Sequence, residues 1–89
     1  MKAIVTVVGK DQVGIIAAVA KDLAEANVSV QDISQTVMQG YFTMMMVTEL
    51  TENSMDLSGL SQKLEKTGKE LGISIRVQRE EIFDAMHRV

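Results

Sequence analysis

The sequence predicts an α+β sandwich, in which two helices cover one face of a four-stranded antiparallel sheet and a short helix follows. Four strand-like apolar runs and two segments of helical periodicity occur in the order β-α-β-β-α-β, and a turn signal joins the middle two runs. Right-handed crossovers then place both helices on one sheet face, which is the ferredoxin-like arrangement. With 89 residues, we expect one domain over residues 1–89, including a C-terminal helical extension over residues 80–89.

The first strand and the first helix are expected in the N-terminal third of the chain. Lys2 to Val8 is rich in β-branched residues, which favour a buried strand. Val13 to Ala26 has the periodicity of an amphipathic helix, with one apolar face formed by Ile16, Val19, Leu23 and Ala26. Asn27 follows as a left-handed stop for this helix.

A hairpin is expected in the middle of the chain. Val28 to Gln39 has a strand composition, but its apolar alternation changes phase, so we expect a β-bulge near Gln31 and Asp32. The Gln39-Gly40 turn leads into a returning strand over residues 41–50.

The second half of the chain predicts a helix, a strand and a terminal helix. Asp56 is placed to cap a helix that ends at Gly72 and carries leucines on one side: Leu57, Leu60, Leu64 and Leu71. Ile73 to Arg79 alternates as a strand. The extension over residues 80–89 carries three apolar residues that we expect to pack on the body or on a partner: Ile82, Phe83 and Met86.

The first and third strands are apolar on both faces, although the two main helices can cover only one. In the third strand, alternation sends Met44 and Met46 to one face and Met45 to the other, as flexible core filling. The remaining face needs the C-terminal helix, a second copy or another partner to cover it, and residue spacing does not distinguish these.

Composition excludes several classes of function. The net charge is −3 and the pI about 5.0, which disfavours nucleic-acid binding, and no stretch is long and apolar enough to span a bilayer. The absence of cysteine removes disulfides and thiolate metal sites, and His87, the sole histidine, has no evident fellow ligand. We expect a soluble cytoplasmic protein that is not an enzyme and uses no cofactor or metal.

The stretch GKDQVGII, residues 9–16, has the glycine spacing of the first half of a phosphate-binding loop. Such a loop needs Lys and then Ser or Thr directly after its second glycine, and this chain has Ile15 and Ile16 there. An acylphosphatase of this fold needs an arginine in the first loop, where the chain has Lys10 and Asp11. Neither a nucleotide site nor phosphatase chemistry is therefore expected.

The same loop has the charges that suit a small zwitterion such as a free amino acid. The following helix start offers unpaired N–H groups to a carboxylate, and Asp11 offers its own carboxylate to an ammonium group. Sequence alone favours a simpler role, in which Asp11 caps the helix by accepting from the N–H of Val13 or Gly14.

The loop Gly-x-Asp-x-x-Gly over residues 9–14 is followed by a helix ending in LAEANVSV, a hairpin, a second helix and a last strand. On this loop and these elements, the whole chain resembles the ACT domain family. The likeness is to small stand-alone bacterial members and to the ACT modules of the glycine-cleavage repressor and formyltetrahydrofolate deformylase. In this family the residue before the second glycine is often proline, and here it is Val13.

The resemblance implies a regulatory module whose copies pair side by side and bind an amino acid at their boundary. The ligand-facing positions carried over are Gly9, Asp11, Gly14 and Ser29. With the rest of the loop, the expected binding set is Gly9, Lys10, Asp11, Gln12, Val13, Gly14, Ile15 and Ser29. The alternative is a ligand-free module that dimerises or docks on a metabolic enzyme or a transcription regulator.

Overall fold

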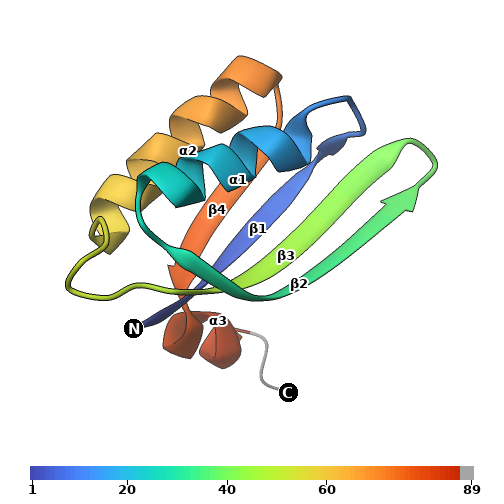
Figure 1. Ribbon diagram of the computed structural model, residues 1–89. Helices are drawn as coiled ribbons and strands as arrows, with labels where there is room; N and C mark the ends of the chain where they lie inside the picture. Colours follow the sequence, from blue (N-terminus) through green and yellow to red (C-terminus); the bar gives the residue numbers. More distant parts are fainter. Residues whose placement is uncertain (87–89) are drawn as a thin grey trace.

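The computed structural model describes residues 1–86, apart from the side chain of Met86, as a sheet with two helices on one face and a third on the other (Figure 1). The elements follow the predicted order: β1 (Lys2–Lys10), α1 (Ile15–Glu25), β2 (Ser29–Met38), β3 (Tyr41–Glu49), α2 (Leu57–Leu71), β4 (Ser74–Arg79) and α3 (Glu80–Met86). The sheet is antiparallel in the order β2-β3-β1-β4, so β2 and β4 form its edges. The predicted fold class is confirmed.

The core lies between the sheet and the pair α1 and α2. From β1 it takes Ala3, Val5 and Val7, and every second residue of β3 from Phe42 to Met46 joins them. As predicted, Met44 and Met46 are buried while Met45 is 39% exposed on the other face. The two helices contribute five large buried side chains: Ile15, Val19, Leu23, Leu60 and Leu64.

Most local signals in the sequence were interpreted correctly. The register of β2 against β3 shifts between Val30 and Asp32, which places the predicted bulge at Gln31. Asn27 has φ 60°, as expected for a left-handed stop. Asp56 caps α2 by accepting from the Gly59 N–H at 2.8 Å, and Gly72 ends the helix in the left-handed region.

The start of α1 differs from the prediction. The helix begins at Ile15 rather than Val13, its N-cap residue is Gly14 at φ 95°, and no side chain caps it. The expectation that Asp11 caps this helix is therefore wrong. A glycine at positive φ takes the N-cap position, so the helix begins two residues later than periodicity suggested and Asp11 is not its cap residue.

The third helix lies on the sheet face opposite α1 and α2 (Figure 1). Phe83 is half-buried and lines a pocket of about 280 Å³ with Ile4 and Met45, whereas Ile82 remains 50% exposed. The expected packing of Met86 and the last part of the extension, including His87, lie outside the described residues. Within residues 1–86, none of the helices has the length and apolar character needed to cross a membrane.

Candidate functional site: the loop between β1 and α1

The loop that joins β1 to α1 holds most of the predicted site residues at one end of the sheet. It lies next to the tip of the β2–β3 hairpin, because the Asp11 N–H donates to the Gly40 carbonyl at 2.8 Å. The first bond of the α1 ladder runs from the Ala18 N–H to the Gly14 carbonyl at 2.9 Å. The N–H groups of Ile15, Ile16 and Ala17 precede that bond, so nothing within the helix accepts from them.

The Asp11 side chain makes no described contact that holds the loop. It is exposed, and among the described residues it has no hydrogen-bond or ion-pair partner. Gly14 completes this open arrangement, since a Cβ built there would meet no atom within 4 Å. An exposed carboxylate and an uncapped helix start therefore lie within the same short segment, residues 11–17.

Gly9 and Gln12 of the predicted site have structural roles instead. A Cβ on Gly9 would lie 2.4 Å from Cγ2 of Ile73, so the glycine is required by packing against the residue just before β4. The Gln12 side-chain amide donates to the Leu71 carbonyl at 2.9 Å, which fastens the loop to the C-terminal end of α2. Neither contact was foreseen, because each partner lies about sixty residues away in the sequence.

The other predicted site residues fall into three environments. Lys10 is exposed at the end of β1, and Val13 is 100% exposed. The Ile15 side chain is buried in the core, so only its backbone can face a ligand. Ser29 lies at the opposite end of the sheet, because both Ser29 and Lys2 pair with Glu49, whereas Lys10 and Met38 pair with Tyr41.

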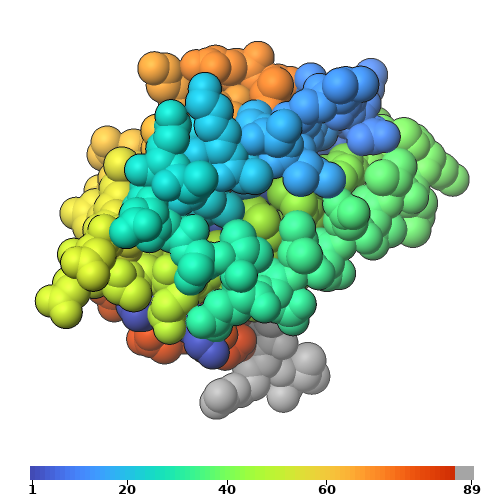
Figure 2. All heavy atoms as spheres, in the orientation of Figure 1, coloured from blue at the N-terminus to red at the C-terminus, as the bar shows by residue number. Residues whose placement is uncertain are grey.

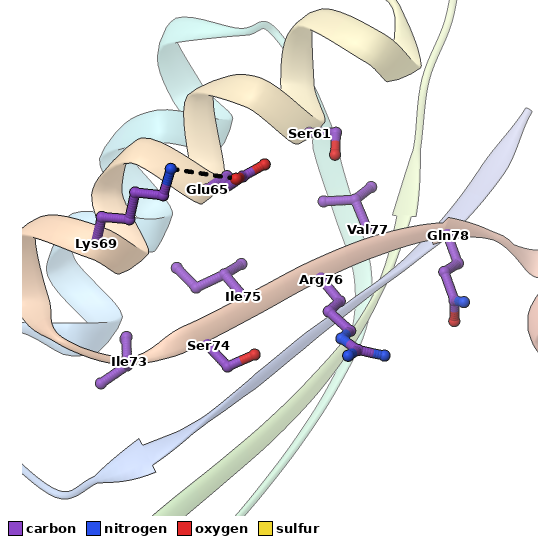
Figure 3. Close-up of a pocket in the computed structure, with 9 residues that line it drawn as sticks. All are labelled: Ser61, Glu65, Lys69, Ile73, Ser74, Ile75, Arg76, Val77 and Gln78. Carbon is purple, nitrogen blue, oxygen red and sulfur yellow. Dashed lines mark ion pairs between the residues drawn. The ribbon is translucent and has the colours of Figure 1, made fainter.

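A second surface, which sequence reasoning missed, is a groove of about 500 Å³ between α2 and the edge strand β4 (Figure 3). Ile75 and Val77 point from β4 toward α2, while Arg76 and Gln78 point to the other side. On the helix, Glu65 and Lys69 form an exposed ion pair at 3.5 Å. The alternating residues 73–79 predicted the strand but could not show that its outer edge lies open beside a helix.

Comparison with known proteins identifies the family. The profile of the ACT domain matches residues 2–78. This chain belongs to the ACT domain family. A UPF0237 protein of Clostridium acetobutylicum is 52% identical over 89 residues, covering all of both chains. The solved ACT domain protein from Streptococcus pneumoniae shares 45% identity over 98% of each chain with a TM-score of 0.80.

A more distant relative shows the ACT fold within a larger regulatory protein. The regulatory subunit of aspartate kinase from Thermus thermophilus has a TM-score of 0.67 and 26% identity, over 86% of this chain and 50% of that one. ACT domains form a family of regulatory modules that bind small molecules. Among residues 1–86, no group of three or more His, Cys, Asp or Glu side chains is arranged to hold a metal ion.

Proposed function

We propose that this ACT domain is a non-enzymatic regulatory module that binds an amino acid at the boundary between two copies of the chain. The observation that carries the proposal is the start of α1, where uncapped N–H groups follow an exposed Asp11 carboxylate that has no partner among the described residues. The ligand's carboxylate accepts from the helix start, which carries a partial positive charge, and its ammonium group pairs with Asp11.

In the proposed site, few residues contribute side chains to the ligand, and the others contribute backbone groups. Asp11 supplies charge, and Lys10 is exposed at the end of β1, the strand that leads into the loop. The rest of the loop, Gln12 to Ile15, contributes backbone groups, because the Gln12 side chain is engaged with Leu71 and that of Ile15 is buried. Gly9 shapes the loop through its packing on Ile73.

The second copy is expected to add its β2 strand to the β2 edge of the first. Every residue of β2 is exposed, and Ile33 to Gln39 contains no charge and no proline, so the usual protections of an edge strand are missing. Antiparallel pairing about a twofold axis joins the two sheets into one and leaves all four main helices on the same face.

The β-strand period restricts the register of this pairing. Ile33, Gln35 and Val37 lie on the helix side of β2, opposite Met46, Met44 and Phe42. Residues directly opposite across two strands share a face, so helix-side residues must pair with helix-side residues. Among such registers, a twofold axis at Gln35 is the one that sets Ile33 opposite Val37 of the second copy, apolar against apolar.

This register also brings Ser29 of the second copy to the loop. With the axis at Gln35, residue pairs can be counted outward along the two β2 strands, with one extra residue for the bulge at Gln31. This count sets Ser29 of the second copy beside Gly40 at the hairpin tip. The Asp11 N–H is bonded to that same Gly40. The two halves of the predicted site, which lie at opposite ends of one subunit, meet across the dimer boundary.

The ligand proposal is tested by thermal shift against the twenty amino acids, with two isosteric variants. Asp11→Asn removes the charge beside α1 and is expected to abolish the ligand-induced rise in melting temperature. Asp56→Asn is the matched control, since asparagine caps a helix as well as aspartate does. If no amino acid shifts the parent protein, the ligand-free interaction module becomes the better account; an Asp11→Asn protein that responds like the parent removes Asp11 from the site.

The register is tested by disulfide cross-linking, which the cysteine-free chain permits without background. With the axis at Gln35, Ser34 lies opposite Thr36 of the second copy. An equimolar mixture of Ser34→Cys and Thr36→Cys proteins is expected to oxidise to a heterodimer faster than either variant links to itself. Preferential self-linking of Ser34→Cys places the axis at Ser34 instead, and an absence of any link in the three samples argues against β2 pairing.

A further inference from the structure

A band of exposed apolar side chains borders the proposed ligand site. One flank of α1 faces α2. On this flank Asp22 accepts a hydrogen bond from Thr67, and Glu25 forms an ion pair with Lys63 at 3.0 Å. Helical spacing puts Ile16 and, one turn later, Ala20 on the opposite flank, toward β2. Ile16 is 45% exposed and Ala20 is exposed as well.

The floor beside that flank is also apolar. Val37 and Ile33 lie on the helix side of β2 and are 55% and 50% exposed, because α1 and α2 lie over the other strands. Figure 2 shows the recess that results between α1 and β2, with atoms of β3 visible at its bottom. Val37 shares its row across the sheet with Phe42 and with Gly9, the first residue of the loop.

The part of the recess next to the loop is apolar, and Gln35 lies one row further along, between Val37 and Ile33 on the same face of β2. Asp11 and the helix start lie at the loop end, and Gln35 lies at the proposed twofold axis. A zwitterion held at Asp11 extends its side chain over Ile16 and Val37, the two apolar side chains that come before Gln35. Burying a hydroxyl, amide or charge without a partner weakens binding, whereas burying methyl groups strengthens it.

We infer that the ligand is an amino acid with an aliphatic side chain, of the size of valine, leucine or isoleucine. This inference rests on the proposed function, since it assumes an amino acid at the loop. The second copy closes the recess from the β2 side and adds its own Ile33 to the apolar floor, opposite Val37. Each further buried methylene in the ligand is expected to tighten binding by about fourfold.

Calorimetric titration with L-valine and L-threonine tests this directly, because the two ligands have the same shape and differ by a methyl and a hydroxyl group. Valine is expected to bind about tenfold or more tightly than threonine, and the series alanine, 2-aminobutyrate, valine, isoleucine is expected to rise in affinity. Equal binding of threonine and valine, or a preference for serine or a charged amino acid, overturns the inference and leaves the proposed function standing. Binding of no amino acid at all overturns both.

Two valines on opposite sheet faces provide the matched variants. Val37→Thr places a hydroxyl in the recess and is expected to weaken valine binding severalfold while reducing the preference over threonine. Val8→Thr makes the same change at a 45% exposed valine on the other face and is expected to leave both affinities unchanged. Since threonine favours strands, both proteins should fold; Ile16→Ala supplies a second change on the α1 wall. Valine affinity that is indifferent to both Val37→Thr and Ile16→Ala contradicts the inference.

Discussion

The two main helices begin in opposite ways. At α2, the Asp56 carboxylate accepts from the Gly59 N–H at 2.8 Å, and the Asp56 carbonyl accepts from the Leu60 N–H at 2.9 Å. At α1, the N-cap position is Gly14, which has no side chain to accept from the helix, and the nearest upstream carboxylate, Asp11, bonds to nothing described. Both helices follow a loop that contains an aspartate, yet one start is closed and the other is open.

This difference separates a structural helix start from a binding one. In α2 the chain's own carboxylate occupies the position that an external anion would take, and the helix gains stability from it. In α1 the chain forgoes that gain, and in our account an amino-acid ligand supplies the acceptor. A substitution at the start of α2 should therefore change the stability, whereas a substitution at the start of α1 should change the response to ligand.

The largest effect on stability is expected at Gly9, which shapes the open loop through close packing. Gly9→Ala would place Cβ 2.4 Å from Cγ2 of Ile73, and relieving that overlap should cost about 1–3 kcal/mol. Urea unfolding of the variant measures it. A loss below about 0.5 kcal/mol would mean that Ile73 moves freely and that packing does not fix the loop.

Removing the two aspartates separates the two helix starts most clearly. Asp56→Ala deletes the α2 cap and is expected to lower the free energy of unfolding by about 1 kcal/mol. Asp11→Ala removes no described contact and should change it by less than about 0.5 kcal/mol, as for other surface substitutions. Equal losses in chemical denaturation would show that Asp11 supports the helix start after all.

The smallest effect is expected at the far end of α1, where Glu25 pairs with Lys63 at 3.0 Å. The hydrogen bond and the charge of Lys63 hold the pKa of the Glu25 carboxyl below its ordinary value. Because the folded pKa is the lower one, the pair contributes its stability above the unfolded pKa and loses it as the pH falls through the folded pKa.

Denaturation of the parent and Lys63→Gln proteins at several pH values measures this contribution. The difference between them is expected to be constant above about pH 5 and to shrink toward zero in more acidic solution. A difference that grows on acidification would reverse the assigned direction. The ligand response should be the same in both proteins, since this end of the helix is remote from the loop.

Local patterns were sufficient to predict most of the fold. The phase change near Gln31 predicted the bulge, and Asp56 and Gly72 predicted both ends of α2, because each signal depends on residues within a few positions. The order of the elements then left few possible topologies. The edge position of β2 agrees with the ferredoxin-like strand order.

The candidate site was less predictable because its geometry depends on distant contacts. Gly9 faces Ile73, and Gln12 bonds Leu71, and neither partner can be inferred from the loop itself. Asp11 was assigned to the helix cap because its distance from the first apolar turn suits that role. The positive φ of Gly14 decided otherwise, since it delays the helix until Ile15.

The comparison of the two helix starts is tested most directly by amide NMR spectra recorded during titration with L-valine. The chain contains no proline, so both helix starts can be followed residue by residue. We predict that the largest shifts occur at the amides of Val13 to Ala17, with further shifts at Ser29 from the second copy, while the amides of Leu57 to Leu60 stay unchanged. Shifts concentrated at the start of α2, or spectra indifferent to valine and to every other amino acid, would contradict the account.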